Sequence, residues 1–142
     1  MRKAITILLA CVCIAACVAP AAAAGSRFDD VKPTDWFYDA VEFVVENGLM
    51  IGVSDSSFEP DEPTTRAMLV TVLWRLENRP PVPGECPFPD VEAGEWYADA
   101  VTWASEHGIV LGYDDGTFRP DGLITREQFV TILYRYDKTR NK

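Results

Sequence analysis

Four segments of the chain carry apolar residues at the spacing of an α-helix. The four stripes are Trp36, Ala40, Val41 and Val44; Leu69, Val72, Leu73 and Leu76; Trp96, Ala100, Val101 and Ala104; and Phe129, Ile132, Leu133 and Tyr136. Thr65 and Thr125 stand where N-cap residues are expected, ahead of the second and fourth stripes. Asn47-Gly48 and His107-Gly108 follow the first and third stripes and are typical of helix ends. The pattern predicts four short helices in two helix–loop–helix units.

The two units are copies of one another. The chain aligns with itself without a gap at an offset of 60 residues, with about two in five positions identical. We therefore divide it into a repeat over residues 25–77, a Pro-rich linker over 78–87, a second repeat over 88–137 and a polar tail over 138–142. Helices this short need a packing partner, so we expect an all-α module with prongs at 28–76 and 88–136.

The first 24 residues are expected to be an export signal. Arg2 and Lys3 precede an uncharged apolar run, and Ala22-Ala23-Ala24 is a suitable cleavage site. A second interpretation stays open, in which Cys17 is lipidated as in a lipoprotein. Both place the protein outside the cytoplasm, secreted or at the cell surface, with no membrane span after cleavage.

The charge after cleavage restricts the binding partners. Loss of Arg2 and Lys3 leaves 11 of the 13 Lys and Arg against 22 Asp and Glu, which gives a net charge of −11. A chain this acidic lacks the basic surface that nucleic acids require. Cys86 is the one cysteine outside the signal, and its role stays open. No nucleophile–base constellation recurs, so we expect neither catalysis nor a cofactor. Asp114-Asp115-Gly116 is interpreted as a turn rather than a metal site.

The conserved order of short motifs in both copies resembles S-layer homology (SLH) repeats. The second copy shows them as Phe88-Pro89-Asp90-Val91, Trp96-Tyr97-Ala98-Asp99-Ala100-Val101, Gly112 to Pro120, and Ile124-Thr125-Arg126. The first copy keeps Phe28-Asp29-Asp30-Val31, Trp36-Phe37, Asp39-Ala40-Val41, Phe58-Glu59-Pro60 and Thr65-Arg66. Together the two copies cover nearly all of the chain after the signal.

The resemblance implies a non-catalytic module that binds secondary cell-wall polymers of Gram-positive type walls, with repeats arranged as a pseudo-trimeric helical bundle. It implies that Arg66 and Arg126, with Thr65 and Thr125, meet an acidic group of the glycan, such as a pyruvyl ketal. It also implies that the loops at Gly52-Val53 and Gly112-Tyr113 line the binding grooves. A guanidinium suits this role because it can grip a carboxylate with two parallel hydrogen bonds. Backbone N–H groups at the helix start are expected to add to the attraction.

The sequence departs from the family pattern in two ways, and several alternative interpretations of its residues stay open. The family's third repeat is missing, and the glutamate of its Thr-Arg-Ala-Glu motif is replaced by Met68 and Gln128, of which only Gln128 can complete a capping box. The arginines could instead form intramolecular salt bridges. The tryptophans could stack on sugars, but periodicity favours packing of Trp36 and Trp96 in the core or between the repeats. Trp74 and Trp103 lie off the main stripes and are better candidates for an exposed or inter-repeat face. An alternative function is a protein-interaction or oligomerisation module that completes a three-repeat bundle with itself or another S-layer homology protein.

Overall fold

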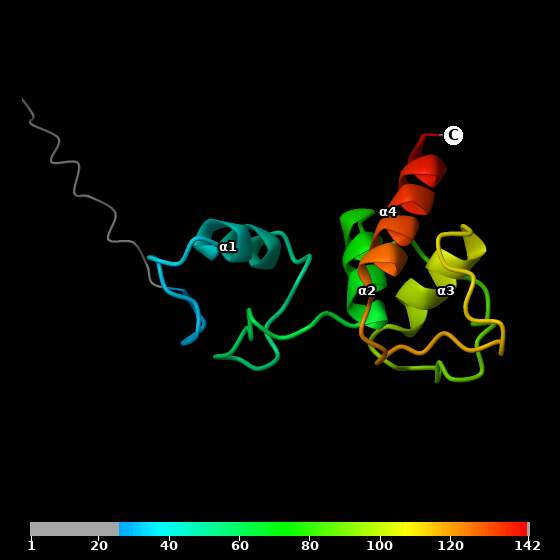
Figure 1. Cartoon of the computed structure of the whole chain (residues 1–142), viewed down its shortest axis with the longest axis horizontal. Coiled ribbons are helices and arrows are strands. Elements are labelled where there is room, and N and C mark those ends of the chain that lie inside the picture. The colour runs from blue at the N-terminus through cyan, green and yellow to red at the C-terminus, as the bar shows by residue number, and fades with distance from the viewer. Residues whose placement is uncertain (1–25, 142) are drawn as a thin grey trace, which may run out of the picture.

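The fold is helical. A computed structural model describes residues 26–141, so the expected signal over 1–24 lies outside the described residues. The helices are α1 (Tyr38–Glu46), α2 (Arg66–Leu76), α3 (Ala98–Glu106) and α4 (Arg126–Arg140) (Figure 1). The described part contains no β-strand, only an isolated bridge between Thr65 and Leu123. The all-α prediction is confirmed. Within 26–141, every helix is too short or too polar to cross a membrane.

The main helix pair is formed between the two sequence repeats. Helix α2 of the first repeat packs on α3 of the second, whereas α1 lies apart from this group (Figure 1). The larger core contains Val70 and Leu73 of α2 together with Val101 and Trp103 of α3. The division into prongs at 28–76 and 88–136 stays a prediction, and the apolar face of α2 is buried against the next repeat. The pseudo-trimeric arrangement stays a prediction.

Side-chain size explains why α3, rather than α1, is the buried partner of α2. Ala100 and Ala104 of α3 are fully buried and present no bulk, so another helix can approach closely. In α1 only Val41 is buried, and it joins Phe28 and Val31 in a separate small cluster. Arg75 and Arg79 tie this cluster to α2, because their guanidinium groups donate to the backbone oxygens of Leu49 and Gly48.

Both repeats fold their long loop around a partly buried aspartate, whose carboxylate binds backbone N–H groups of the loop. The Asp30 carboxylate accepts hydrogen bonds from the backbone N–H groups of Phe58 and Glu59, and Asp90 does the same for Phe118 and Arg119. In each copy, the phenylalanine two residues before the aspartate packs on a phenylalanine of the loop. The ring centroids are 5.4 Å apart for Phe28–Phe58 and 5.6 Å apart for Phe88–Phe118. The Phe-x-Asp-Val motif is thus the element that holds the loop.

The predicted caps are confirmed at the starts of α2 and α4 and at the ends of α1 and α3. The Thr65 hydroxyl accepts from the N–H of Met68, and Thr125 and Gln128 form a complete capping box. Asn47 and His107 are the C-cap residues of α1 and α3, and a glycine of positive φ follows each. The turn interpretation is confirmed as well, because the Gly116 N–H donates to the Tyr113 carbonyl oxygen at 2.9 Å.

The expectation that Trp36 and Trp96 are packed is wrong, whereas Trp103 lies between the repeats, as expected. Trp36 and Trp96 precede α1 and α3 rather than lying within them, and their side chains are 94% and 53% exposed. Trp103, which lies off the predicted stripe, is instead buried in the core between α2 and α3. The indole N–H of Trp74 donates to the Pro80 carbonyl oxygen. Periodicity alone does not name the packing partner of a helix, and the partner of α3 is the helix α2 of the preceding repeat.

Candidate functional site

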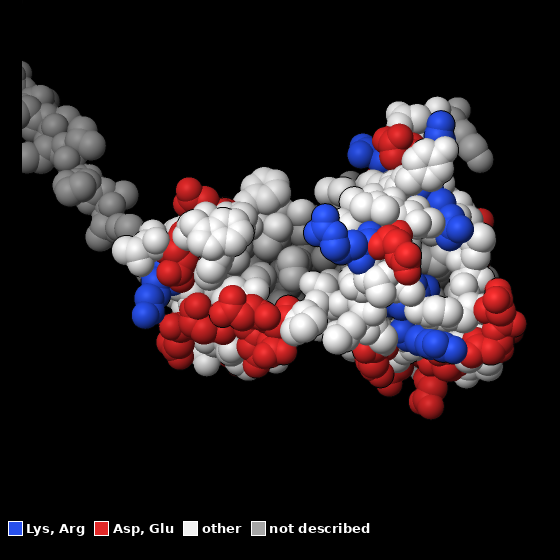
Figure 2. All heavy atoms as spheres, viewed as in Figure 1, with Lys and Arg blue, Asp and Glu red and all other residues white. Residues whose placement is uncertain are grey.

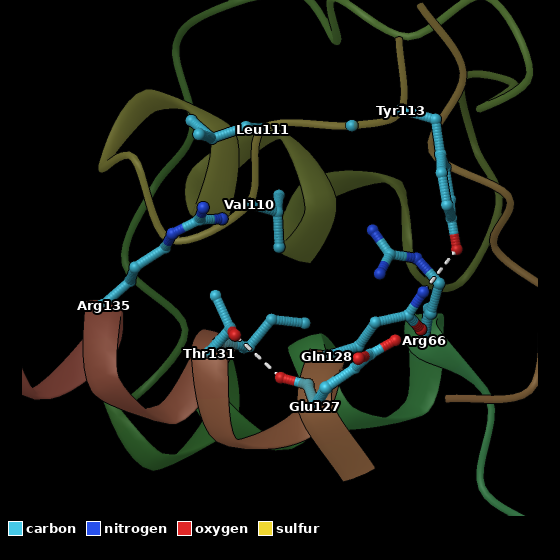
Figure 3. A pocket seen from close by; sticks show the side chains of 10 residues that line it. Arg66, Val110, Leu111, Tyr113, Glu127, Gln128, Thr131 and Arg135 are labelled. Atoms are coloured by element: carbon cyan, nitrogen blue, oxygen red, sulfur yellow. Dashed lines mark hydrogen bonds between the residues drawn. The ribbon is translucent and has the colours of Figure 1, made fainter. Parts of the chain in front are cut away.

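A groove of about 340 Å³ lies where α2, α4 and the segment 110–113 meet. Its wall on one side is Val110 to Tyr113, and on the other it is the exposed face of α4, with Arg66 of the first repeat at one end (Figure 3). Grooves of this volume are large enough for a small ligand such as one or two sugar units. Its location explains why neither repeat alone could supply it.

Arg66 is a buried arginine without an acidic partner in the described residues. Its side chain is 6% exposed, its Nε–H donates to the Phe118 carbonyl oxygen at 3.0 Å, and its guanidinium lies 4.8 Å and 4.9 Å from the ring centroids of Tyr113 and Phe118. The ion pairs found over 26–141 are Arg119–Asp115 and Arg140–Glu77. The salt-bridge interpretation of Arg66 is therefore wrong.

Burial sets the electrostatics of this arginine. It lowers the pKa of Arg66 from its ordinary value, and nearby Arg119 lowers the pKa further, while Tyr113 raises it. A guanidinium stays protonated at any physiological pH despite such a shift. The group is thus a desolvated cation that an anion entering the groove can stabilise by charge-assisted hydrogen bonds.

Tyr113 is held between two cations and an amide. In addition to its contact with Arg66, the Tyr113 ring has the Arg119 guanidinium 4.2 Å from its centroid. Gln128 Nε2–H donates a hydrogen bond to the Tyr113 hydroxyl oxygen at 2.9 Å. Gln128 therefore closes the capping box of α4 and also fixes the groove's aromatic wall. The family motif has Glu in place of Gln128. A Glu carboxylate could keep this hydrogen bond only by accepting it from the Tyr113 hydroxyl.

The predicted site residues are only partly brought together. Arg66, Gly112 and Tyr113 line the same groove. Thr65 and Thr125 act as N-caps and do not line it, and Arg126 is exposed at the start of α4. Gly52 and Val53 belong to the corresponding loop of the first repeat, which contributes nothing to this groove. Within residues 26–141, the groove thus combines the arginine of the first repeat with the loop of the second.

The glycines of the two loops are explained by packing. A Cβ on Gly112 would stand 2.5 Å from Phe88 Cε1, and one on Gly52 would stand 2.3 Å from Phe28 Cε1. Gly112 also has a φ of +73°, which side-chain-bearing residues rarely adopt. The family pattern at these positions therefore first serves the loop fold, and the backbone of Gly112 lines the groove as a consequence.

The expectation that helix N–H groups help to attract an anion is wrong for α2. The backbone N–H groups of Arg66 and Ala67 donate to the carbonyl oxygens of Gly122 and Pro120, each at 3.0 Å. These bonds join the start of α2 to the second repeat and leave its N–H groups engaged. The attraction at this groove must come from the side chains.

Several groove residues were missed from the sequence. Leu111, Glu127, Thr131 and Arg135 line it, and Figure 3 shows Arg135 on α4 opposite Leu111. Thr131 and Arg135 recur at the offset of 60 residues as Thr71 and Arg75, on the side of the helix away from the main stripe. That recurrence of polar residues was the available signal.

A second hollow lies beside Trp96 and is less suited to an acidic ligand. It is lined by Asp90, Glu92, Glu95 and Asp121, with Arg119 as its one basic residue. Arg119 is already paired with Asp115 at 2.7 Å. Carboxylates in such excess repel an anion, so the groove at Arg66 is the better candidate.

Comparison with known proteins places the chain in a family. The S-layer homology domain model matches residues 27–67 and 87–130. An S-layer protein of Bacillus thuringiensis subsp. finitimus and the S-layer protein sap of Bacillus anthracis are each 30% identical over 141 residues, which is 99% of this chain and 17% of theirs. Endo-1,4-beta-xylanase A of Thermoanaerobacterium saccharolyticum is 36% identical over 104 residues, 73% of this chain and 9% of the xylanase.

The chain therefore belongs to the S-layer homology domain family, a class of cell-wall anchoring modules. It spans less than a fifth of the length of these relatives, so each of them carries much sequence outside the matched region. The family and the S-layer relatives point to the cell surface or wall as the location.

Proposed function

We propose that the groove at Arg66 binds an acidic substituent of a secondary cell-wall polysaccharide and so attaches the protein non-covalently to the bacterial wall, without catalysis. The observation that carries this proposal is the buried Arg66 guanidinium, which faces a groove and has no carboxylate partner in residues 26–141. An unpaired buried charge is costly, and a ligand carboxylate offsets that cost.

The remaining groove residues suit a sugar chain. Arg135 provides a second cation, Glu127 and Thr131 provide acceptors and a hydroxyl, and Leu111 and Val110 provide an apolar wall. Sugar rings combine hydroxyl groups with apolar faces, so this mixture matches their chemistry. Because the groove draws on both repeats, binding also resists separation of α2 from the second repeat, and ligand should stabilise the fold.

Retention on purified cell walls tests the proposal. The protein should sediment with intact walls and stay in solution when the secondary polysaccharide has been extracted from them. Thr131→Trp should abolish retention by filling the groove from an exposed position on α4 while leaving the helical spectrum unchanged. Arg126→Ala is the matched control, because Arg126 is exposed and lies outside the groove. Equal retention of Thr131→Trp and the parent protein would rule the groove out.

A further inference from the structure

In the α2–α3 interface, the second helix of one repeat packs on the first helix of the next repeat. The equivalent helices of the other repeat, α4 and α1, leave the corresponding faces exposed. Within the chain, Val70 and Leu73 of α2 are 0% and 4% exposed because α3 covers them. Their counterparts at the offset of 60 residues are Val130 and Leu133 of α4, which are 60% and 37% exposed. The same type of apolar face is thus covered on α2 and uncovered on α4.

Helix α1 shows the complementary half. On α3, Ala100 is fully buried and Trp103 is 4% exposed against α2. Their counterparts on α1 are Ala40, which is exposed, and Phe43, which is 59% exposed. α1 also lies apart from α4 of the same chain, so the two faces do not cover one another (Figure 1).

The charges of α4 and α1 are complementary in the same sense as those of α2 and α3. α2 carries Arg66 and Arg75 and no acidic residue, and α3 carries Asp99 and Glu106 and no basic one. The basic residues of α4 are Arg126, Arg135, Lys138 and Arg140, against Glu127 and Asp137. α1 carries Asp39, Glu42 and Glu46 without a basic residue. Figure 2 shows a further group of acidic side chains below α1, over the loop that follows this helix, and they add to the negative charge of this part of the molecule.

We infer that the protein associates head to tail with a second copy of itself, α4 of one copy packing on α1 of the next as α2 packs on α3. The occupant is a second copy because one chain carries both complementary faces, and opposite charges on them favour this pairing over α4 with α4 or α1 with α1. Such a contact is heterologous, so each copy keeps one free half unless a ring closes. The apolar contacts of this association, Val130 and Leu133 of α4 and Phe43 of α1, lie outside the proposed polysaccharide groove, whereas Glu127 and Arg135 border both surfaces.

The proposed contact between copies also brings together Arg126 and the Gly52-Val53 loop, which lie apart within one chain. Within the chain, Arg66 at the start of α2 lies against the loop that contains Gly112, Tyr113 and Phe118. In the head-to-tail pair, Arg126 at the start of α4 lies against the partner's loop with the equivalent Gly52, Val53 and Phe58. The junction between copies thus rebuilds the arrangement that the chain forms once internally.

One position opposes the pairing and provides a test. Glu127 of α4 corresponds to Ala67, which is fully buried in the internal interface. A carboxylate at the edge of the α4 face weakens the contact unless it turns into the groove, which it lines. The association should therefore be weak for the parent protein and tighter for Glu127→Ala.

Sedimentation velocity over a range of protein concentrations tests the inference. The parent protein and every variant are prepared with the same N-terminus. The parent protein should show a concentration-dependent dimer and larger species. Val130→Glu and Phe43→Glu, each at an exposed position, should be monomeric with an unchanged helical spectrum. Glu127→Ala should lower the dissociation constant by about tenfold. Leu76→Glu, at an exposed position of α2 outside the α4 and α1 faces, is the control and should associate like the parent.

A mixture of Val130→Glu and Phe43→Glu separates head-to-tail pairing from other modes. The first variant keeps an intact α1 face and the second an intact α4 face, so an equimolar mixture should form a heterodimer that stops at two copies. A parent protein that stays monomeric at every concentration would overturn the inference. So would association that both glutamate variants retain, or a mixture that forms no heterodimer. Wall retention by Phe43→Glu, measured separately, reports on the groove and is expected to persist.

Discussion

Arg66 and Phe118 are 52 residues apart in the chain, and the side chain of one is hydrogen-bonded to the backbone of the other at 3.0 Å. This contact joins the second helix of one repeat to the loop of the next. It fixes the guanidinium at the end of the groove and couples the stability of the two repeats to the geometry of the site.

Arg66→Lys should lower the free energy of unfolding by about 1–3 kcal/mol, because it leaves a buried carbonyl oxygen of Phe118 without its donor. Arg126→Lys repeats the same change at an exposed counterpart and should cost less than about 0.5 kcal/mol. Urea unfolding followed by far-UV circular dichroism measures both. Equal costs for the two variants would show that Arg66 is not a structural link between the repeats.

Two glycine substitutions separate crowding from backbone strain. Gly112→Ala brings a Cβ to 2.5 Å from Phe88 Cε1, in addition to its positive φ, and should cost about 3 kcal/mol or more. Gly116→Ala has a φ of +81° but nothing within 4 Å of the added carbon, so it should cost about 1 kcal/mol. The measurement is the midpoint of thermal unfolding. A smaller loss for Gly112→Ala than for Gly116→Ala would contradict the packing described for Phe88.

Tyr136 should contribute through its hydrogen bond to Glu77. Its hydroxyl donates to the Glu77 carboxylate, and burial together with this bond raises the pKa of Tyr136 from 10.0 to about 12. Because the folded pKa is above the unfolded one, the stabilisation is complete below pH 10 and is lost as pH rises through about 12.

The phenolate absorbance of the parent protein and of Tyr136→Phe locates this titration. Tyr136→Phe should also lower the free energy of unfolding by about 1 kcal/mol at neutral pH. Tyr134→Phe, at a 63% exposed position on the same helix, is the control and should leave stability unchanged. Loss of the high-pH titration in Tyr134→Phe instead of Tyr136→Phe would reverse the assignment.

The first-repeat loop should loosen in acid. Hydrogen bonds from the backbone of Phe58 and Glu59, and from the Ser57 hydroxyl, hold the pKa of Asp30 below its ordinary value of 3.8, although burial acts to raise it. Its contribution is therefore present above pH 3.8 and is lost as pH falls through the lower folded value.

Protection factors of the Phe58 and Glu59 amides report this opening by hydrogen exchange. Asp30→Asn should lower both factors already at neutral pH, whereas Asp55→Asn, at an exposed position in the same loop, should not. Unchanged protection in Asp30→Asn would show that the Asp30 carboxylate does not hold the loop.

Local features of the fold were predictable from the sequence, and the packing partners were not. Thr65, Thr125 and Gln128 could be assigned as caps because capping depends on residues within one turn of the helix. Helical periodicity shows which face of α2 is apolar, but it does not say whether α1 or α3 covers that face. The wrong expectation for Trp36 and Trp96 follows from this missing information.

The site was predictable to a similar degree. Resemblance to the family singled out Arg66, Gly112 and Tyr113, which lie in one groove. It gave equal weight to Arg126 and to Gly52-Val53, which the chain does not bring together. Only the inter-repeat packing distinguishes the assembled copy from the separated one, and that packing depends on contacts between residues about 50 positions apart, such as Arg66 and Phe118.

Titration of the protein with isolated wall polysaccharide, before and after chemical removal of the acidic substituents of that polysaccharide, tests the central claim most directly. Pairing of a ligand carboxylate with Arg66 predicts that removal weakens binding at least about tenfold, or about 1.4 kcal/mol, and that Arg66→Lys weakens binding of the intact polysaccharide by a similar factor. Equal affinity for the two polysaccharides, with Arg66→Lys binding like the parent protein, would contradict it.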